Sequence, residues 1–235
     1  MLSHLTDDLA AARRRDPAAR SSFEVALTYP GVHALWAYRI THWQWTHGMK
    51  LLARWGAALS QHFTGVDIHP AASLGSGIFI DHATGVVIGE TAEVGDDVTI
   101  YQGVTLGGTS LEHVKRHPTI GNRVTIGAGA KILGPITVGD DSRIGANAVV
   151  VKSVPPNSVV VGVPGQIIAR SNAAQSMPPP DLRDAQMPDL VGLSLQALLR
   201  RVDELETKVH GQPSKDKDDV RPSPAGIWSG EDFSI

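Results

Sequence analysis

The chain has 235 residues, of which 42% are hydrophobic and 19% charged, enough for one good core with appendages in a soluble protein. A formal net charge of -3 offers no basic stripe for nucleic acid, and the absence of cysteine excludes disulfides, thiolate metal sites and a cysteinyl acyl-enzyme. No stretch resembles a signal peptide or a membrane span, so we expect a cytoplasmic protein without a membrane partner.

Residues 1–64 are predicted to form a helical domain. Thr6 or Asp7 can cap a first helix, Asp16-Pro17 has the form of an ordinary helix start, and Pro30-Gly31 breaks the next helix. Apolar residues then recur at helical spacing, which predicts a cap over the end of the following domain. They are Leu35, Trp36, Ile40, Trp43, Leu51, Leu52, Trp55 and Leu59. The histidines among them are interpreted as structural: His33, His42, His47 and His62.

From Ile68 onward an aliphatic residue returns every six positions, and a glycine often follows it. The series is Ile68, Leu74, Ile80, Ile88, Val94, Ile100, Leu106, Ile120, Ile126, Ile132, Val138, Ile144 and Val150. A period of six fits neither a helix nor a simple strand; it indicates a short strand and a tight turn repeated as one unit. Each repeat can bury its aliphatic residue only against stacked neighbours, which predicts a parallel β-helix over residues 65–170.

Two interruptions of this period indicate where function lies. Ile80 to Ile88 spans eight residues, and Leu106 to Ile120 spans fourteen, so that a polar loop with two histidines and two cations leaves a rigid scaffold. Three corner positions that normally hold glycine are instead His69, Asp81 and Tyr101.

The segments VDIHPAA, IDHATGVVIGE, GVTLGGT, KRHP, IGAGAKILGPI and GVP resemble serine O-acetyltransferases, a family of hexapeptide-repeat acyltransferases. The resemblance covers roughly residues 13–170 and implies a left-handed β-helix that associates as a homotrimer. It implies acetyl transfer from acetyl-CoA to L-serine in cysteine biosynthesis, giving O-acetylserine and coenzyme A through a ternary complex. No permanently bound cofactor and no metal are expected.

Acetyl transfer to a hydroxyl requires a base near neutral pKa and a group that orients it, and the resemblance assigns these roles to His82 and Asp67. Ile68 and Ile80 begin repeats within one coil, which puts Asp67 and His82 on the same small scaffold. The structural alternatives are a cap at the entry to the first coil for Asp67 and a polar corner residue for His82.

Serine is a zwitterion, so its site needs a carboxylate for the ammonium and a cation for the carboxylate. The resemblance places Asp16 and Asp81 on the ammonium, and Arg116 and His117 on the carboxylate. For coenzyme A it nominates Gly108, Thr109, Ala128 and Ala146, with Arg143 and Lys152 for the phosphates, in a groove between neighbouring β-helices. The glycines and alanines can also be explained by packing alone.

Beyond the repeats we expect a linker at 171–188, an amphipathic helix at 189–210 and a flexible tail at 211–235. The apolar seam of the helix fits either a trimeric coiled coil or packing on its own subunit. In the family a terminal isoleucine, here Ile235, inserts into O-acetylserine sulfhydrylase, which makes that enzyme an expected partner.

Three other functions remain open at this stage. One is O-acetyl transfer to a sugar or antibiotic, because a fold alone does not select the acceptor. A second is a γ-type carbonic anhydrase with zinc on His82, His113 and His117. The third is a non-enzymatic scaffold that binds the sulfhydrylase, against which the intact set of predicted site residues argues.

Overall fold

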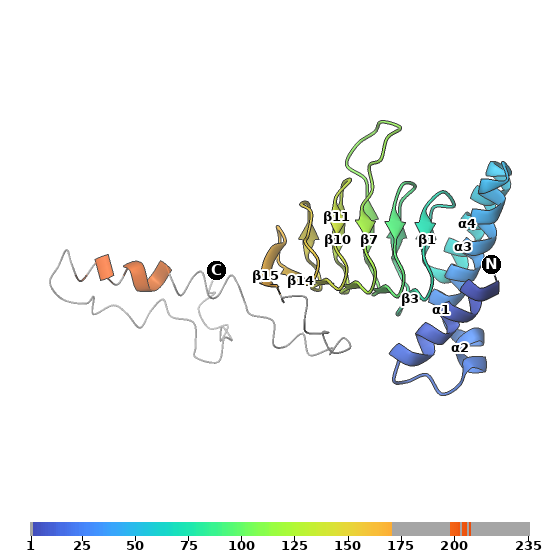
Figure 1. Ribbon diagram of the computed structural model, residues 1–235, viewed down its shortest axis with the longest axis horizontal. Helices are drawn as coiled ribbons and strands as arrows, with labels where there is room; N and C mark the ends of the chain where they lie inside the picture. Colours follow the sequence, from blue (N-terminus) through green and yellow to red (C-terminus); the bar gives the residue numbers. More distant parts are fainter. Residues whose placement is uncertain (1, 171–197, 203, 206, 208–235) are drawn as a thin grey trace, which may run out of the picture. The chain divides into compact units, whose positions relative to one another are not determined.

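The computed structural model describes residues 2–170 and, further on, 198–202, 204, 205 and 207 (Figure 1). The chain divides into two units, Met1–Leu182 and Arg183–Ile235. In this described part, no helix combines the length and apolar character needed to cross a bilayer. The predicted linker, tail and Ile235 lie outside these residues. Residues 198–202, 204, 205 and 207 are helical, within the range of the predicted amphipathic helix.

The first 64 residues form four helices: α1 (Leu2–Arg15), α2 (Ser22–Thr28), α3 (Pro30–Thr46) and α4 (Lys50–Thr64). The predicted helix starts are wrong in two places. Thr6 and Asp7 lie inside α1, which already begins at Leu2 because the leucines before them favour helix, and Asp16 follows the end of α1 instead of opening a helix. Pro30 opens α3 as expected, and Gly65, with φ of 72°, ends α4.

The repeats fold into a parallel β-helix with three walls. Wall A contains β1, β4, β7, β10 and β13; wall B contains β2, β5, β8 and β11; wall C contains β3, β6, β9, β12, β14 and β15. The strands are β1 (Asp67–Ile68), β2 (Ser73–Leu74), β3 (Phe79–Ile80), β4 (Val87–Ile88), β5 (Glu93–Val94), β6 (Thr99–Ile100), β7 (Thr105–Gly107), β8 (Thr119–Ile120), β9 (Thr125–Ile126), β10 (Lys131–Leu133), β11 (Thr137–Val138), β12 (Arg143–Ile144), β13 (Val149–Val150), β14 (Ser158–Val161) and β15 (Gln166–Arg170). We name the corners A–B, B–C and C–A after the walls that the chain joins there.

The six-residue period is confirmed as the origin of the core. Equivalent aliphatic residues stack in register, with Ile88 paired to Leu106 and Ile132 paired to Val150, and every aliphatic residue of the series is buried. The last segment departs from the parallel β-helix predicted for residues 65–170: β15 pairs antiparallel with β14, because the chain reverses at Gly162, where φ is 91°.

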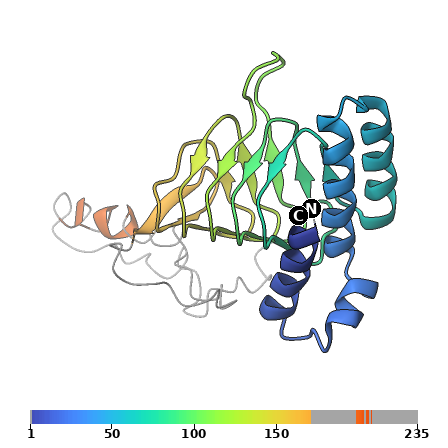
Figure 2. The ribbon, with the colours of Figure 1, turned by 45° about the vertical axis from the view of Figure 1, so that its right-hand side comes forward.

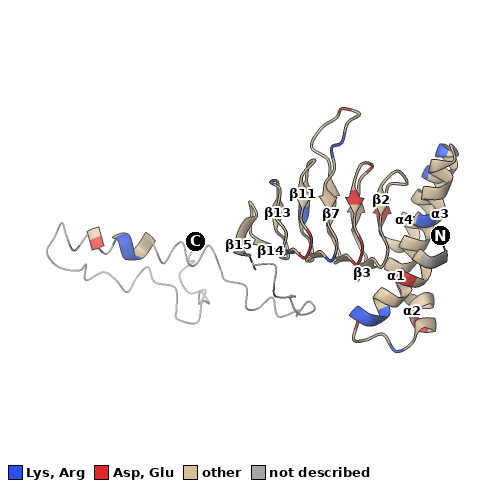
Figure 3. Ribbon diagram, in the orientation of Figure 1, with Lys and Arg blue, Asp and Glu red and all other residues tan. Residues whose placement is uncertain are grey.

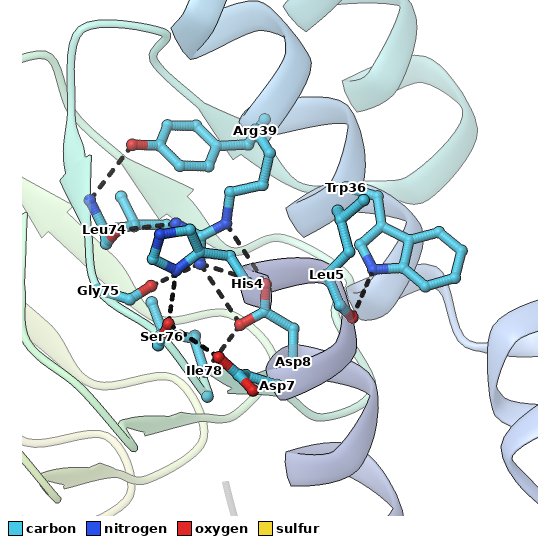
Figure 4. A network of polar contacts seen from close by, with 12 residues as sticks. His4, Leu5, Asp7, Asp8, Trp36, Arg39, Leu74, Gly75, Ser76 and Ile78 are labelled. Carbon is cyan, nitrogen blue, oxygen red and sulfur yellow. Dashed lines mark hydrogen bonds and ion pairs between the residues drawn. The ribbon is translucent and has the colours of Figure 1, made fainter. Parts of the chain in front are cut away.

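The helices cover the first coil, whose backbone has no preceding coil to pair with (Figure 2). Arg39 donates to the carbonyl oxygens of Leu74 (2.7 Å) and Gly75 (2.5 Å), and it forms a buried ion pair with Asp8 at 3.2 Å. Asp8 in turn accepts the amide of Ile78 at 3.1 Å (Figure 4). This Asp8–Arg39 pair therefore satisfies backbone groups that a cap must satisfy.

The predicted cap is only partly right about which side chains it buries. Leu35 is buried, but the large apolar residues of α4 point outward; Leu51 is 86% exposed and Trp55 63%. The inward positions of α4 carry small residues, such as Ala53 and Ala57, which let the helix approach α3 closely. The other exposed large apolar residues of α3 and α4 are Ile40, Trp43, Leu52, Leu59 and Phe63.

Candidate active site

The predicted catalytic and acceptor residues lie at two corners of the prism. The C–A corner between β3 and β4 carries Asp81 and His82, while the A–B corner receives Arg116 and His117 from the loop between β7 and β8. That loop projects from the body and carries both acidic and basic residues (Figure 3).

The first interruption of the repeat forms the turn that presents His82. His82 and Ala83 both adopt left-handed backbone conformations, with φ of 54° and 56°. The turn stacks on the end of α4, because the amide of Gly85 donates to the carbonyl of Gly65 at 2.8 Å. Ala83 is buried and His82 is exposed, so the extra residues direct the imidazole outward from the wall.

Asp67 lies on the neighbouring strand β1, in register with Val87 of β4. Its side chain is half-buried, and its amide donates to the carbonyl of Val86 just after the His82 turn. No hydrogen bond joins the Asp67 carboxylate to the His82 ring within residues 2–170. The pairing of these two groups stays a prediction.

Asp16 and Asp81 form an acidic pair next to His82. The Tyr29 hydroxyl donates to Oδ2 of Asp16, and the amide of Ala18 donates to Oδ1 at 2.7 Å. Burial raises the pKa of Asp81, and the negative charge of Asp16 acts in the same direction. The bond to Asp16 contributes most to raising the pKa of Tyr29 to about 12. Two neighbouring carboxylates of this kind favour a bound cation.

At the A–B corner the loop returns and attaches to the preceding coil. Lys115 Nζ donates to the carbonyl of Thr91 (2.6 Å) and to Glu93 (2.9 Å), and Arg116 Nη2 donates to Glu90 Oε2 at 2.5 Å. Although partial burial opposes ionisation of Glu90, the bond from Arg116 lowers the pKa of its carboxyl group. The guanidinium is thus held in place by Glu90 beside the buried ring of His117.

The residues nominated for coenzyme A also divide between corners. Gly108 lies against Arg116, since a Cβ there would stand 3.2 Å from Arg116 Cγ, and Thr109 packs beside Gly134 at the A–B corner. Ala128 and Ala146 occupy adjacent coils at the C–A corner; Arg143 is on β12 of wall C, and Lys152 follows β13 at the A–B corner and is exposed.

Comparison with known proteins gives the family. Residues 117–152 match the family described as bacterial transferase hexapeptide (six repeats). A serine acetyltransferase of Mycobacterium tuberculosis is 60% identical over 235 residues, which cover 100% of both chains. The chain belongs to the serine acetyltransferase family.

Solved serine acetyltransferases share the fold. The enzyme of Brucella abortus strain S19 in complex with coenzyme A has 49% identity and a TM-score of 0.70, over 72% of this chain and 68% of that one. The enzyme of Neisseria gonorrhoeae in complex with serine has 48% identity and a TM-score of 0.68, over 70% and 67%. The expected left-handed β-helix with N-terminal helices is confirmed.

The zinc alternative finds no support in the described part of this serine acetyltransferase. No three histidine, aspartate or glutamate side chains there converge as a metal site would require. His113 is exposed on the loop, and His117 is buried at its base. The helical histidines are structural as expected where they bond to backbone: His33 to Ala26 and His42 to Pro70, both at 2.8 Å.

Sequence reasoning missed the residues that hold the predicted ones. Tyr29 binds Asp16, Glu90 binds Arg116, and Thr91 binds both Arg116 and His117. At the C–A corner of the next coil, Gln102 has a buried Oε1 that finds no hydrogen-bond partner among the described residues. The only signal for Glu90 was its place at the end of the quoted segment IDHATGVVIGE, and Thr91 lies just beyond that segment.

Proposed function

We propose that this serine acetyltransferase transfers the acetyl group of acetyl-CoA to the hydroxyl of L-serine, with His82 as general base. The observation that carries the residue assignment is that Asp16 lies within electrostatic range of Asp81, the residue that precedes the exposed His82. An ammonium bound by that pair brings the hydroxyl of the same small molecule to the ring.

The reaction then needs four changes of bonding. His82 takes the proton of the serine hydroxyl, and the oxygen attacks the thioester carbonyl carbon. The tetrahedral intermediate collapses with cleavage of the carbon–sulfur bond, and the proton on His82 passes to the departing thiolate of coenzyme A. Asp67 orients the ring and stabilises its protonated form.

A complete acceptor site requires two chains. The two corners are separated by wall A, from Gly85 to Gly89, which is roughly 13 Å at the rise of a strand. The nitrogen and carboxyl carbon of serine are only about 2.5 Å apart. One serine therefore contacts Asp16 and Asp81 of one chain and Arg116 and His117 of another. A homotrimer with coenzyme A in the groove between chains provides this arrangement and explains why the nominated coenzyme residues also divide between corners.

The test is thiol release from acetyl-CoA with L-serine. His82→Ala should lower kcat by about 10²- to 10⁴-fold. His62→Ala, on the exposed face of α4, is the matched control and should behave as wild type. Near-normal release by His82→Ala would remove the general-base assignment, and a faster reaction with a sugar than with serine would favour the other acceptor class.

Two further expectations belong to this proposal. Binding of O-acetylserine sulfhydrylase through Ile235 is tested by removing that residue, which should abolish pull-down of the sulfhydrylase and leave acetyl transfer unchanged. Loss of both properties, or of neither, would contradict it. A cytoplasmic location is the other, and cell fractionation is its test.

A further inference from the structure

The ring of His117 is held by hydrogen bonds at Nδ1 and is bordered by two glycines at Nε2. The residue is 8% exposed. Nδ1 lies 3.2 Å from the amide nitrogen of Thr91 and 2.9 Å from its hydroxyl oxygen. Nε2 lies beside two glycines: a Cβ at Gly89 would overlap the ring, and a Cβ at Gly108 would stand 3.1 Å from Nε2. The ring therefore occupies the room that a side chain at Gly89 would take, and the Nε2 edge of the ring lies against main chain without a side chain at Gly89 or Gly108.

The hydrogen bonds of Thr91 determine where the proton of His117 resides. The Thr91 hydroxyl accepts the amides of Arg116 at 3.0 Å and of His117 at 3.1 Å. A hydroxyl has two acceptor positions and one hydrogen, so with both acceptor positions filled its hydrogen must be donated to Nδ1. The main-chain N–H of Thr91 is directed at the same atom. Nδ1 is therefore an acceptor, and the proton of the neutral ring is on Nε2.

The surroundings of the His117 ring disfavour its doubly protonated, charged form. An N–H at Nδ1 would face two donors of Thr91, and both bonds would be lost. The charged groups around the ring are Lys115 and Arg116, which oppose protonation, and Glu90, which favours it; His69 of the preceding coil is also within electrostatic range. Burial is the largest cause that lowers the pKa of His117, and Arg116 is the next.

We propose that Thr91 is a positioning residue of the acceptor site, which fixes His117 as the neutral tautomer with hydrogen on Nε2 and aligns it with Arg116. His117 is then an uncharged hydrogen-bond donor to the carboxylate of the acceptor, while Arg116 supplies the positive charge. The two site histidines have opposite roles. His82 must accept a proton through a free lone pair, whereas His117 carries hydrogen on Nε2 and can only donate there. This inference rests on the proposed function for the identity of the acceptor, but the tautomer itself does not depend on it.

The tautomer is measured directly by long-range ¹H–¹⁵N correlation of the full-length protein labelled with ¹⁵N-histidine. The His117 signals are assigned by their absence in His117→Gln. We expect the pattern of a neutral ring with hydrogen on Nε2, unchanged from pH 8 to pH 5.5. A pattern with hydrogen on Nδ1, or a ring that titrates near the ordinary histidine pKa of about 6.5, would overturn the proposal. This experiment needs no turnover and no substrate.

Two variants of Thr91 test the positioning role. Thr91→Val keeps the shape and the main-chain N–H but removes the hydroxyl; it should raise the serine KM about tenfold with a smaller effect on kcat, and His117 should titrate at higher pH than in wild type. Thr91→Ser retains the hydroxyl and should restore the serine KM to near wild type. Equal defects in both variants, or a normal KM in Thr91→Val, would refute the role of the hydroxyl. If the wild-type protein does not turn over serine, the proposed function fails and the tautomer measurement still decides the inference.

Discussion

Substitution of Arg39 by methionine tests how the helical domain is attached to the β-helix. The guanidinium donates to two carbonyl oxygens of the first coil and neutralises Asp8, which has no exposed surface. Methionine fills a similar volume without charge. The variant leaves a buried carboxylate without a counter-ion, and breaking such a pair costs about 3–5 kcal/mol.

Proton uptake limits the part of this loss that comes from the charge of Asp8, while the lost hydrogen bonds to the carbonyls of Leu74 and Gly75 add to it. Asp8 can become neutral by binding a proton, and from an unfolded-state pKa of about 3.9 this costs about 4 kcal/mol at pH 7 and only about 1.5 kcal/mol at pH 5. Burial already raises the pKa of Asp8 in the native protein, against the opposing effect of Arg39. In the variant the folded state binds more protons than the unfolded state between pH 4 and the raised pKa. The free energy of unfolding must therefore fall as pH rises through this window.

The assay is urea unfolding at one fixed protein concentration, at pH 7 and pH 5. Arg39→Met should be destabilised by about 3–5 kcal/mol at pH 7 and by roughly half of that at pH 5. Arg54→Met on the exposed side of α4 is the matched control, and the double variant Asp8→Asn/Arg39→Met should lose the pH dependence. A loss below about 1 kcal/mol at pH 7, or one that does not shrink at pH 5, would refute the reasoning.

Three further predictions concern the site. Glu90→Ala should raise the serine KM up to about fivefold in initial-rate assays, because Arg116 loses the partner that orients it; an unchanged KM would contradict this. Gly89→Ala should raise the serine KM by about tenfold or more, because its Cβ would displace the His117 ring, and a crystal structure of the variant with the ring unmoved would argue against it. Tyr29→Phe removes the hydrogen bond to Asp16 and should lower kcat/KM for serine about fivefold with little change in thermal unfolding; equal kcat/KM values would show that the bond has no role.

The core could be predicted from the sequence because its physical cause is local. One aliphatic residue in six leaves a chain few ways to bury it other than stacked coils, and residues such as Ile88 and Ile132 are buried as expected. The orientation of α4 could not be predicted in the same way. Apolar spacing shows that a helix has an apolar face, but the face turned inward was the one with Ala53 and Ala57, because small residues allow closer packing.

The candidate site also contains residues that the sequence pattern locates and residues that it does not. Asp81 and His82 are visible as departures from the repeat, so the sequence locates their corner. The partners that hold the acceptor residues are invisible in it, because Thr91 and Glu90 meet the loop across about one coil and a half of chain, a contact that no local pattern encodes. The position of Tyr29 beside Asp16 depends likewise on how α2 returns along α1.

The constant spacing of the coils fixes how far apart the site residues lie along the β-helix axis. Neighbouring strands of one wall lie about 4.8 Å apart. The loop begins after β7, but it is bonded to Glu90 and Thr91, which follow β4 in the preceding coil. The His82 turn leads into that same strand β4. Insertion of one whole coil between β4 and β7 would keep every wall intact and yet lift the origin of the loop beyond the reach of these bonds. Adding a whole coil in this region would therefore preserve the β-helix but not the site, because the site depends on the number of coils between the loop and its partners.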